Sequence, residues 1–482
     1  MFEGIDDRIL KRTKRHCAER GIVIPTFGQL RDPTKIPASV KARLANLGMD
    51  DLDPANLFRI TWKNEPKDRG GGFNNGNWIE FPPALTGVQA RIIGLVGKHF
   101  PTGAHKVGAA FGCLAPRLVG GMFDPIAQKA VWPSTGNYCR GGAFDSALLG
   151  CTAVAILPEQ MSRERFDWLA SLGTEVIKTP GGEANVKEIY DKCWEIRRTR
   201  PDCVVFNQFD EFGNAIWHFH CTGGVIDEIF NRIKGPRDRL AGYVSATGSA
   251  GTIAAGDFLR TRHPAVRVVA AEAQQCPTLY NCGFGDHRIE GIGDKHVPWI
   301  HNVRNTDMVA AIDDEQCLSL MRLFNEDAGK GMLERQGVGD DLIAALPLVG
   351  ISGICNLVAA IKTARYYDMN ANDAIFLPLT DSMGLYQSRI AELRQHHGSY
   401  TDLLAGRHFA RYLEGINVDH LRELGYYQRK QLHNFKYFTW VEQQGRSADE
   451  LRGLWDPDFW AETFGQVGQW DKMISEFNGD SK

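Results

Sequence analysis

The segment PTGAHKVGAAFG holds one lysine, Lys106, between a glycine-containing turn and small residues that can begin a helix. A lysine in a ligand crevice can condense with an aldehyde, and desolvation lowers the pKa of its amine enough to leave part of it nucleophilic. Taken alone the signal is weak, because most lysines that follow a turn are solvated surface residues. A catalytic role for Lys106 therefore depends on what the rest of the chain places beside it.

A second segment, PSTGNYCRGGA, runs from a predicted strand end into a helix start. Backbone N–H groups at a helix start have no partner inside the helix and can bind a carboxylate, with hydroxyls adding further donors. The residues concerned are Ser134, Thr135, Gly136 and Asn137, and Asn137 can also reach a ring hydroxyl. An ordinary helix N-cap is the structural alternative for the same segment.

A third turn, SATGSAGTIAAG, follows a predicted strand and opens another helix. Its backbone N–H groups can wrap a phosphate. The residues that would form this cradle are Gly248, Ser249, Ala250, Gly251 and Thr252. Their glycine spacing does not match the dinucleotide fingerprint, and the chain has no Walker motif. The phosphate is therefore expected to belong to a ligand other than NAD or ATP.

The elements around these turns alternate between short apolar runs and longer amphipathic stretches. The predicted strands are KAVWP, CTAVAILP, TEVIKTP, CVVFNQF, GYVSATG and RVVAAEA, and the predicted helices are SRERFDWLASLG, ending at Gly173, and EANVKEIYDKCWEIRRT. Apolar strands joined by helices predict parallel sheets covered on both faces, with ligands at the carboxyl ends of the strands. The glycine-rich turns lie at those ends.

Composition excludes several function classes. A chain of 482 residues is too long for a single core. With 55 basic and 58 acidic residues and no Lys/Arg run, nucleic-acid binding is not expected. The first residues lack a secretory signal and no apolar stretch is long enough for a membrane span, so we expect a cytoplasmic protein. The 11 cysteines form no C-x-x-C pair, which indicates neither a disulfide framework nor a zinc site.

The three turns, in this order, resemble the fold-type II pyridoxal-phosphate enzymes, closest to cysteine synthase and cystathionine β-synthase. The match covers about Arg91 to Arg394 and includes NQFDEFGNAIWHFHCTG, AEAQQC, HRIEGIGDKHVP, GISGICN and TDSMGLYQS. The resemblance implies pyridoxal 5′-phosphate as cofactor. It also implies an α/β fold of two doubly wound parallel-sheet domains, with an N-terminal extension and a helical, aromatic C-terminal extension.

The expected domain organisation follows from this match. We expect an N-terminal extension (1–95), a smaller α/β domain (96–205), a larger cofactor-binding α/β domain (206–395) and a mostly helical C-terminal extension (396–482). Within the last, YYQRKQLHNFKYFTWVEQQ mixes charged and aromatic residues, which favours a helix docked on the body or on a second subunit, with a lid over the site as the alternative.

Residue roles are carried over from the family position by position. Lys106 resembles the lysine that forms the internal aldimine, and Asn137 resembles the partner of the cofactor's 3′ oxygen. Ser382 resembles the partner of the pyridine nitrogen, although Asp381 is adjacent to it. The loop from Ser134 to Gly136, with Gln208, resembles the site of the substrate carboxylate, and Gly248 to Thr252 resemble the phosphate cradle.

The resemblance implies chemistry at the β-carbon of a small amino acid. The first hypothesis is β-replacement of the cysteine-synthase kind through an aminoacrylate, with serine, O-acetylserine or cysteine as substrate. The second is a β-elimination lyase, such as a cysteine desulfhydrase or a serine/threonine deaminase. The third is a low-turnover cofactor-binding partner subunit. GAHK is closer to the tryptophan synthase β subunit, but PSTGN lacks that subunit's acidic residue, so indole chemistry is not expected. A homodimer is implied as well.

Overall fold

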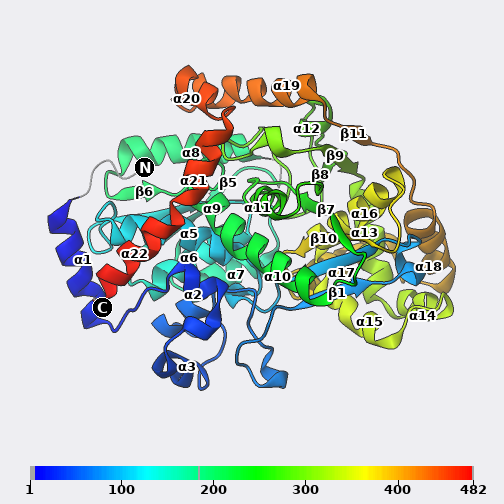
Figure 1. Ribbon diagram of the computed structural model, residues 1–482, viewed down its shortest axis with the longest axis horizontal. Helices are drawn as coiled ribbons and strands as arrows, with labels where there is room; N and C mark the ends of the chain where they lie inside the picture. The colour runs from blue at the N-terminus through cyan, green and yellow to red at the C-terminus, as the bar shows by residue number, and fades with distance from the viewer. Residues whose placement is uncertain (1–5, 183–184, 480–482) are drawn as a thin grey trace.

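Two sheets form the core of the computed structural model, which describes residues 6–182 and 185–479 (Figure 1). Within this part of the chain the larger sheet has seven strands in the order β1-β2-β10-β7-β8-β9-β11. Their bounds, in that order, are Trp78–Phe81, Arg91–Val96, Asp373–Leu379, Arg239–Ala246, Arg267–Ala273, Met308–Ile312 and Leu421–Glu423. The edge strands β1 and β11 are antiparallel to their neighbours, and the five inner strands are parallel.

The smaller sheet has the order β5-β4-β3-β6, and its strands are all parallel. The strands are Glu175–Thr179, Thr152–Pro158, Lys129–Pro133 and Cys203–Val205, in the same order. Helices join and cover both sheets, as the alternating pattern predicts. The fold class is therefore confirmed, and most predicted strands lie where the sequence places them. The first two residues of the predicted helix EANVKEIYDKCWEIRRT, Glu183 and Ala184, lie outside the described residues.

The helices fall into groups by position. Those that accompany the strands are α5 Lys106–Val119, α6 Asn137–Leu148, α7 Arg163–Ser171, α8 Val186–Thr199, α9 Phe212–Trp217, α10 Gly224–Ile233, α11 Ala254–Arg262, α13 Asp314–Asn325, α14 Asp327–Arg335, α15 Asp340–Ala345, α16 Ile351–Tyr366 and α17 Gln387–His397. Short helices α4 Pro83–Thr86 and α12 Thr278–Asn281 lie in loops. The N-terminal helices are α1 Asp7–Glu19, α2 Phe27–Arg31 and α3 Ala38–Leu44; the C-terminal ones are α18 Asp402–Phe409, α19 Tyr426–Lys436, α20 Ala448–Gly453, α21 Pro457–Gly465 and α22 Val467–Asn478.

The two ends of the chain pack against each other and against α5 and α9 (Figure 1). Asp471 of α22 accepts hydrogen bonds from the backbone N–H groups of Phe27 (2.7 Å) and Gly28 (2.9 Å) at the start of α2. The flanks also enlarge the larger sheet, because β1 and most of β2 belong to the expected extension 1–95 and β11 belongs to 396–482. The domain boundaries themselves stay predictions.

Helix α19 docks on the body of the protein. Lys436 Nζ donates to the carbonyl oxygens of Trp299 (2.9 Å) and His301 (2.7 Å). The indole of Trp440, just beyond the helix, donates to the carbonyl of Val297 at 2.8 Å. The aromatic tail is thus a docked element, as the first of its two predicted roles requires. None of the helices in the described residues is long and apolar enough to cross a membrane.

Candidate active site

The strand order brings most of the predicted site residues together. Strands β2, β10 and β7 are adjacent and parallel. The loops at their carboxyl ends carry Lys106, Ser382 and the turn 248–252, respectively. In the smaller sheet β3 and β6 are adjacent and parallel, and their carboxyl ends lead to the loop 134–137 and to Gln208. Both sheets therefore present their predicted binding turns at the carboxyl ends of parallel strands, where α/β proteins bind ligands.

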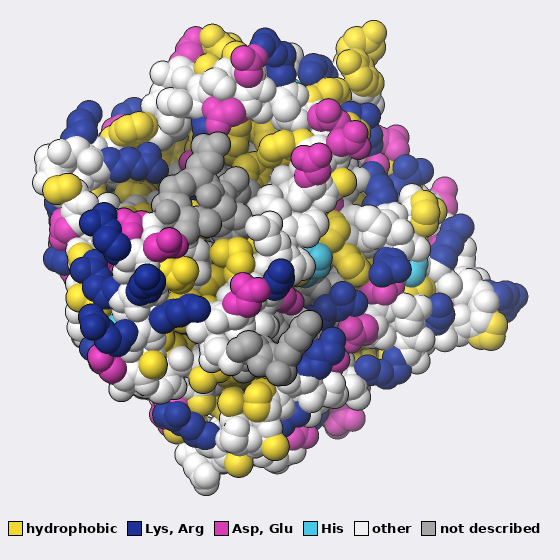
Figure 2. Space-filling model, turned by 60° about the vertical axis from the view of Figure 1, so that its left-hand side comes forward, with side chains coloured by type: hydrophobic (Ala, Val, Ile, Leu, Met, Phe, Trp, Pro, Cys, Tyr) yellow, Lys and Arg dark blue, Asp and Glu magenta, His cyan; other side chains and the backbone are white. Residues whose placement is uncertain are grey.

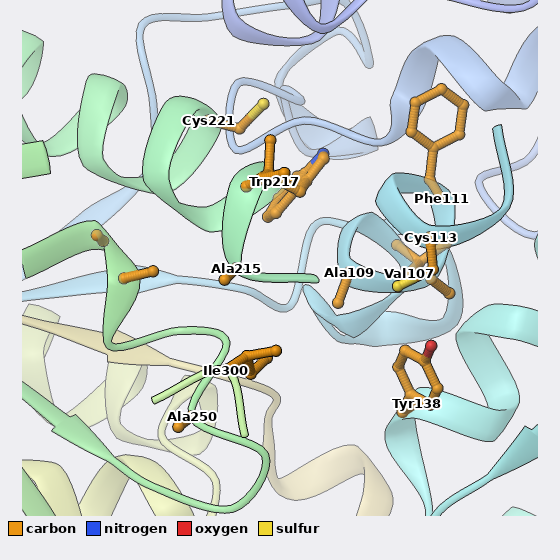
Figure 3. Close-up of a cluster of buried hydrophobic side chains, with 14 of the residues drawn as sticks. Val107, Ala109, Phe111, Cys113, Tyr138, Ala215, Trp217, Cys221, Ala250 and Ile300 are labelled. Atoms are coloured by element: carbon orange, nitrogen blue, oxygen red, sulfur yellow. The ribbon is translucent and has the colours of Figure 1, made fainter. Parts of the chain in front are cut away.

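Close helix packing positions Lys106 at the first residue of α5. A Cβ on Gly108 would lie 2.2 Å from the indole of Trp217, and one on Gly112 would lie 2.4 Å from the carbonyl oxygen of Gly213. The small residues after Lys106 thus let α9 approach α5 closely, and Figure 3 shows Val107, Ala109, Phe111 and Trp217 in the buried cluster that results. The lysine therefore lies at the first residue of a helix that packs closely against α9.

Backbone hydrogen bonds connect the loop before Lys106 to strand β10 and the loop after it. Gly97 donates its N–H to the carbonyl of Leu379 at 2.8 Å, and a Cβ on Gly97 would lie 2.5 Å from the carbonyl oxygen of Thr380. The N–H of His105 bonds to the same Thr380 carbonyl at 3.2 Å. These bonds hold the lysine loop beside the predicted pyridine partner, Ser382, whose side chain is buried.

Lys106 contacts Gln208, which follows strand β6 of the smaller sheet. Lys106 is a half-buried residue, and its Nζ donates to Gln208 Oε1 at 3.3 Å. Gln208 is buried and follows β6, so this contact joins the loops of both sheets. The geometry brings a predicted catalytic amine next to a predicted substrate-carboxylate residue.

The turn 248–252 has the features of an anion cradle. None of its five backbone N–H groups donates to a backbone carbonyl within the described part of the chain. Ala250 has φ of 61°, and a Cβ on Gly251 would lie 1.9 Å from Asn214 Oδ1. Asn214 in turn donates to Ser249 Oγ and to the carbonyl of Gln208, both at 3.0 Å. Asn214, which the sequence reasoning missed, therefore links the cradle to the substrate side.

The carboxylate loop is tightly organised. Ser134 Oγ accepts the N–H of Gly136 at 3.0 Å, and Arg165 Nη1 donates to the carbonyl of Thr135 at 3.1 Å. A Cβ on Gly136 would lie 2.6 Å from Arg165 Nε. Arg165 is fully buried and forms an ion pair with Glu290. Neither residue has a local sequence signal for this role, because the pair joins segments that are far apart in the chain.

Asn137 and Asp381 meet between the two sheets. The Nδ2 of Asn137 donates to Asp381 Oδ2 at 2.7 Å, and the hydroxyl of Tyr386 donates to the same oxygen at 2.7 Å. Burial raises the pKa of Asp381, while the bonds from Tyr386 and Asn137 oppose that shift. The Asp381 carboxyl is therefore engaged with Asn137 and Tyr386.

His105 is packed within the core. Its ring lies 5.3 Å from that of Trp62 and 4.9 Å from that of His218, and its Nε2 is 3.2 Å from Thr380 Oγ1. Burial, together with the charge of Lys106, lowers the pKa of His105 to about 3. The neutral imidazole is thus packed between Trp62, His218 and the Thr380 hydroxyl.

A cavity of about 560 Å³ opens beside this site. Glu290, Met161 and Ile351 belong to its wall, and Arg165 contacts both Glu290 and Met161. Basic side chains, including Arg288 and Arg389, share the lining with acidic ones. On the face shown in Figure 2 basic and acidic side chains are likewise interspersed, in keeping with the net charge of −3.

A family model described as pyridoxal-phosphate dependent enzyme matches residues 97–331. The match spans just under half of the chain, and together with the relatives described below it supports a pyridoxal-phosphate enzyme of the cysteine synthase and cystathionine β-synthase type. The residues of the site fit the cofactor, because an amine, an anion cradle of N–H groups and buried polar side chains lie at the carboxyl ends of neighbouring strands. Pyridoxal-phosphate dependence is therefore established at the level of the family, and the residue roles remain proposals.

Curated relatives of this pyridoxal-phosphate enzyme are similar along much of the chain. A probable cysteine synthase of Bacillus subtilis is 28% identical and matches 55% of this chain and 78% of its own length. Cystathionine beta-synthase of Saccharomyces cerevisiae is 23% identical and matches 78% of this chain and 73% of its own length.

Solved structures share the fold. An O-acetylserine dependent cystathionine beta-synthase from Helicobacter pylori aligns with a TM-score of 0.54 and 22% identity, covering 65% of this chain and 94% of that one. A hydrogen sulfide-producing enzyme from Fusobacterium nucleatum aligns with a TM-score of 0.55 and 21% identity, covering 64% and 96%, respectively.

Proposed function

We propose that the protein catalyses β-replacement on a small amino acid, with serine, O-acetylserine or cysteine as the first candidates. The observation that carries the proposal is the contact of Lys106 Nζ with Gln208 Oε1 between the two sheets. It puts an amine beside the carboxylate site on which a small amino acid would be held. The resemblance to a probable cysteine synthase and to cystathionine beta-synthase supports the same reaction class.

Different residues around Lys106 would bind different parts of the cofactor. The cradle of Gly248, Ser249, Ala250, Gly251 and Thr252 would hold the cofactor phosphate, and Lys106 would link covalently to its aldehyde. Asn137 would donate to the 3′ oxygen. Ser382 would face the pyridine nitrogen. This assignment is supported by the hydrogen bonds that the neighbouring Asp381 carboxyl accepts from Asn137 and Tyr386, because they occupy that carboxyl.

The substrate carboxylate would lie on the loop of Ser134, Thr135 and Gly136. Gln208 turns its amide oxygen toward Lys106, which leaves its amide nitrogen to donate to that carboxylate. When bound, the cofactor supplies an electron sink for the bond broken at the α-carbon. Lys106 Nζ, as a neutral amine, takes the proton from the α-carbon and can return it at the end of the cycle.

β-Elimination to pyruvate and ammonia is the second candidate. In both reactions the substrate loses its α-proton and then the leaving group at its β-carbon, and the two reactions differ in whether a nucleophile or water completes the cycle. The similarity in fold to a hydrogen sulfide-producing enzyme supports this alternative. A low-turnover partner subunit is disfavoured, because Lys106, Asn137 and the cradle are all present.

The decisive experiment combines spectroscopy with product analysis. The purified protein is expected to be yellow, and borohydride reduction followed by peptide mass spectrometry should find the cofactor on Lys106. Serine, O-acetylserine and cysteine are then added singly, with and without sulfide or a thiol. A β-substituted amino acid supports replacement, and pyruvate supports elimination. Racemisation or decarboxylation of an amino acid without a β-leaving group, with neither product, contradicts the β-carbon assignment.

We also propose that the protein is a cytoplasmic homodimer. The 11 cysteines are unpaired and ten are buried, which fits a reducing compartment. The family resemblance supports the dimer. Sedimentation equilibrium of the purified protein tests the dimer, since a monomer at micromolar concentration contradicts it.

A further inference from the structure

The hydrogen bond between Asn137 and Asp381 crosses the boundary between the two sheets. Asn137 is the first residue of α6, which follows β3 of the smaller sheet, and Asp381 follows β10 of the larger sheet. The two side chains are 3% and 1% exposed, respectively, so their 2.7 Å bond is shielded from water. A shielded bond of this kind is stronger and more directional than a surface contact.

This bond determines which way the Asn137 amide points. Its nitrogen faces Asp381, which accepts at Oδ2, and its oxygen is turned toward Arg140 Nη1 at 3.5 Å. A side-chain amide has two N–H donors on that nitrogen. With one N–H used by Asp381, the second remains to donate to a ligand. In the flipped orientation two oxygens would face each other and the donor would be lost.

The carboxyl of Asp381 is itself held in place. Tyr386 donates its hydroxyl to the same Oδ2 at 2.7 Å. A Cβ on Gly350 would lie 1.9 Å from Oδ1, so the backbone of Gly350 closes the other side. The carboxyl is thus confined on both sides, and its acceptor stays directed at Asn137.

We propose that Asp381 is a positioning residue that orients Asn137 for the cofactor from across the domain boundary. The inference rests on the proposed function, in which Asn137 donates to the 3′ oxygen. Asp381 acts through the Asn137 amide and has no contact with the reacting atoms. A donor locked in this orientation binds the cofactor without first having to order its side chain.

Cofactor affinity and absorbance of the holoenzyme test the role. Asp381→Ala is expected to weaken cofactor binding about tenfold and to shift the visible absorbance in the same direction as Asn137→Ala. Asp381→Asn keeps an acceptor oxygen and should restore most of the affinity and the absorbance. Asp381→Leu, which fills the space without an acceptor, should behave like Asp381→Ala and replaces it if the smaller side chain prevents folding.

A double-variant cycle separates positioning from general stability. If Asp381 acts through Asn137, adding Asp381→Ala to Asn137→Ala should change the dissociation constant by less than about twofold. Glu272→Gln is the matched control, because Glu272 is a buried carboxyl that bonds to the backbone of Leu279 and Tyr280. It should leave the absorbance unchanged.

The outcomes are distinguishable. Effects that multiply in the double variant, or an Asp381→Leu protein with wild-type affinity and absorbance, overturn the positioning role alone. A wild-type protein whose cofactor is not attached to Lys106 after borohydride reduction overturns the proposed function, and the positioning role with it.

Discussion

Arg165 and Glu290 form a buried ion pair between segments that belong to the two different sheets, with Nη1 and Oε2 2.6 Å apart. Arg165 comes from α7, between β4 and β5 of the smaller sheet, and Glu290 lies between α12 and β9 of the larger sheet. Arg389 of α17 adds a second cation, its Nε lying 2.5 Å from Glu290 Oε1. Because Arg165 also donates to the Thr135 carbonyl, this pair braces the carboxylate loop against the larger domain.

Glu290→Ala is therefore expected to destabilise the protein by about 3–5 kcal/mol, since it leaves the buried Arg165 without its counter-charge. The substrate KM should rise as well, because the carboxylate loop loses its brace. Urea unfolding and substrate kinetics measure the two effects. Glu315→Ala is the control: this carboxylate pairs with Arg288 at the exposed surface, so its loss should cost only about 0–1 kcal/mol. Equal costs for both variants would contradict the bracing role.

Ser382→Asp should lower β-elimination or replacement and increase transamination. A carboxylate at the pyridine nitrogen keeps the ring protonated and strengthens the electron sink. Chromatography of the keto and amino acid products measures the partition. Ser382→Ala, which removes the hydroxyl without adding charge, serves as control and should not increase transamination. If Ser382→Asp leaves the product ratio unchanged, Ser382 does not face the nitrogen.

Titration of Lys436 should make the free energy of unfolding of the protein depend on pH in the alkaline range. Burial lowers the pKa of Lys436 to about 7, against about 10.4 for an unfolded lysine. Between these values the unfolded chain binds the extra proton, so the free energy of unfolding gains up to about 1.4 kcal/mol per pH unit from this group as the pH rises. Below about pH 7 the group is protonated in both states and adds no slope.

The Lys436→Met protein is expected to lose the part of the slope of unfolding free energy against pH that Lys436 contributes. Urea unfolding from pH 7 to 10 measures this slope. Lys472→Met changes a lysine whose side chain is 77% exposed and should keep the wild-type slope. The same slope in all three proteins would show that Lys436 does not titrate as a buried amine.

Asp471→Ala should loosen the contact between the ends of the chain. The carboxylate accepts two N–H groups at the start of α2, which resembles an N-cap, and loss of such a cap costs about 1 kcal/mol. Urea unfolding and limited proteolysis of α22 report the change. Asp402→Ala removes a carboxylate that is 76% exposed and should have little effect on either measurement.

Much of the fold was predictable because its signals are local. The apolar runs of β3, β4, β7 and β8 are each contained in one short segment, and so are the glycine-containing turns after β3 and β7. The positions of the two antiparallel edge strands were not predictable, because β1 and β11 are short and β11 pairs with β9, which lies far away in the chain. Their partners depend on the assembled sheet.

The sequence by itself determined the chemistry of the separate parts: Lys106 after its turn, the loop 134–137 and the turn 248–252. Only the tertiary structure decided how these parts meet. The strand order β2-β10-β7 brings the lysine loop, Ser382 and the turn 248–252 to one edge, and Asn137 reaches Asp381 across 244 positions of the chain. Such a pairing has no local sequence signal, because it arises from the packing of elements of the two sheets against each other and from the exclusion of water between them.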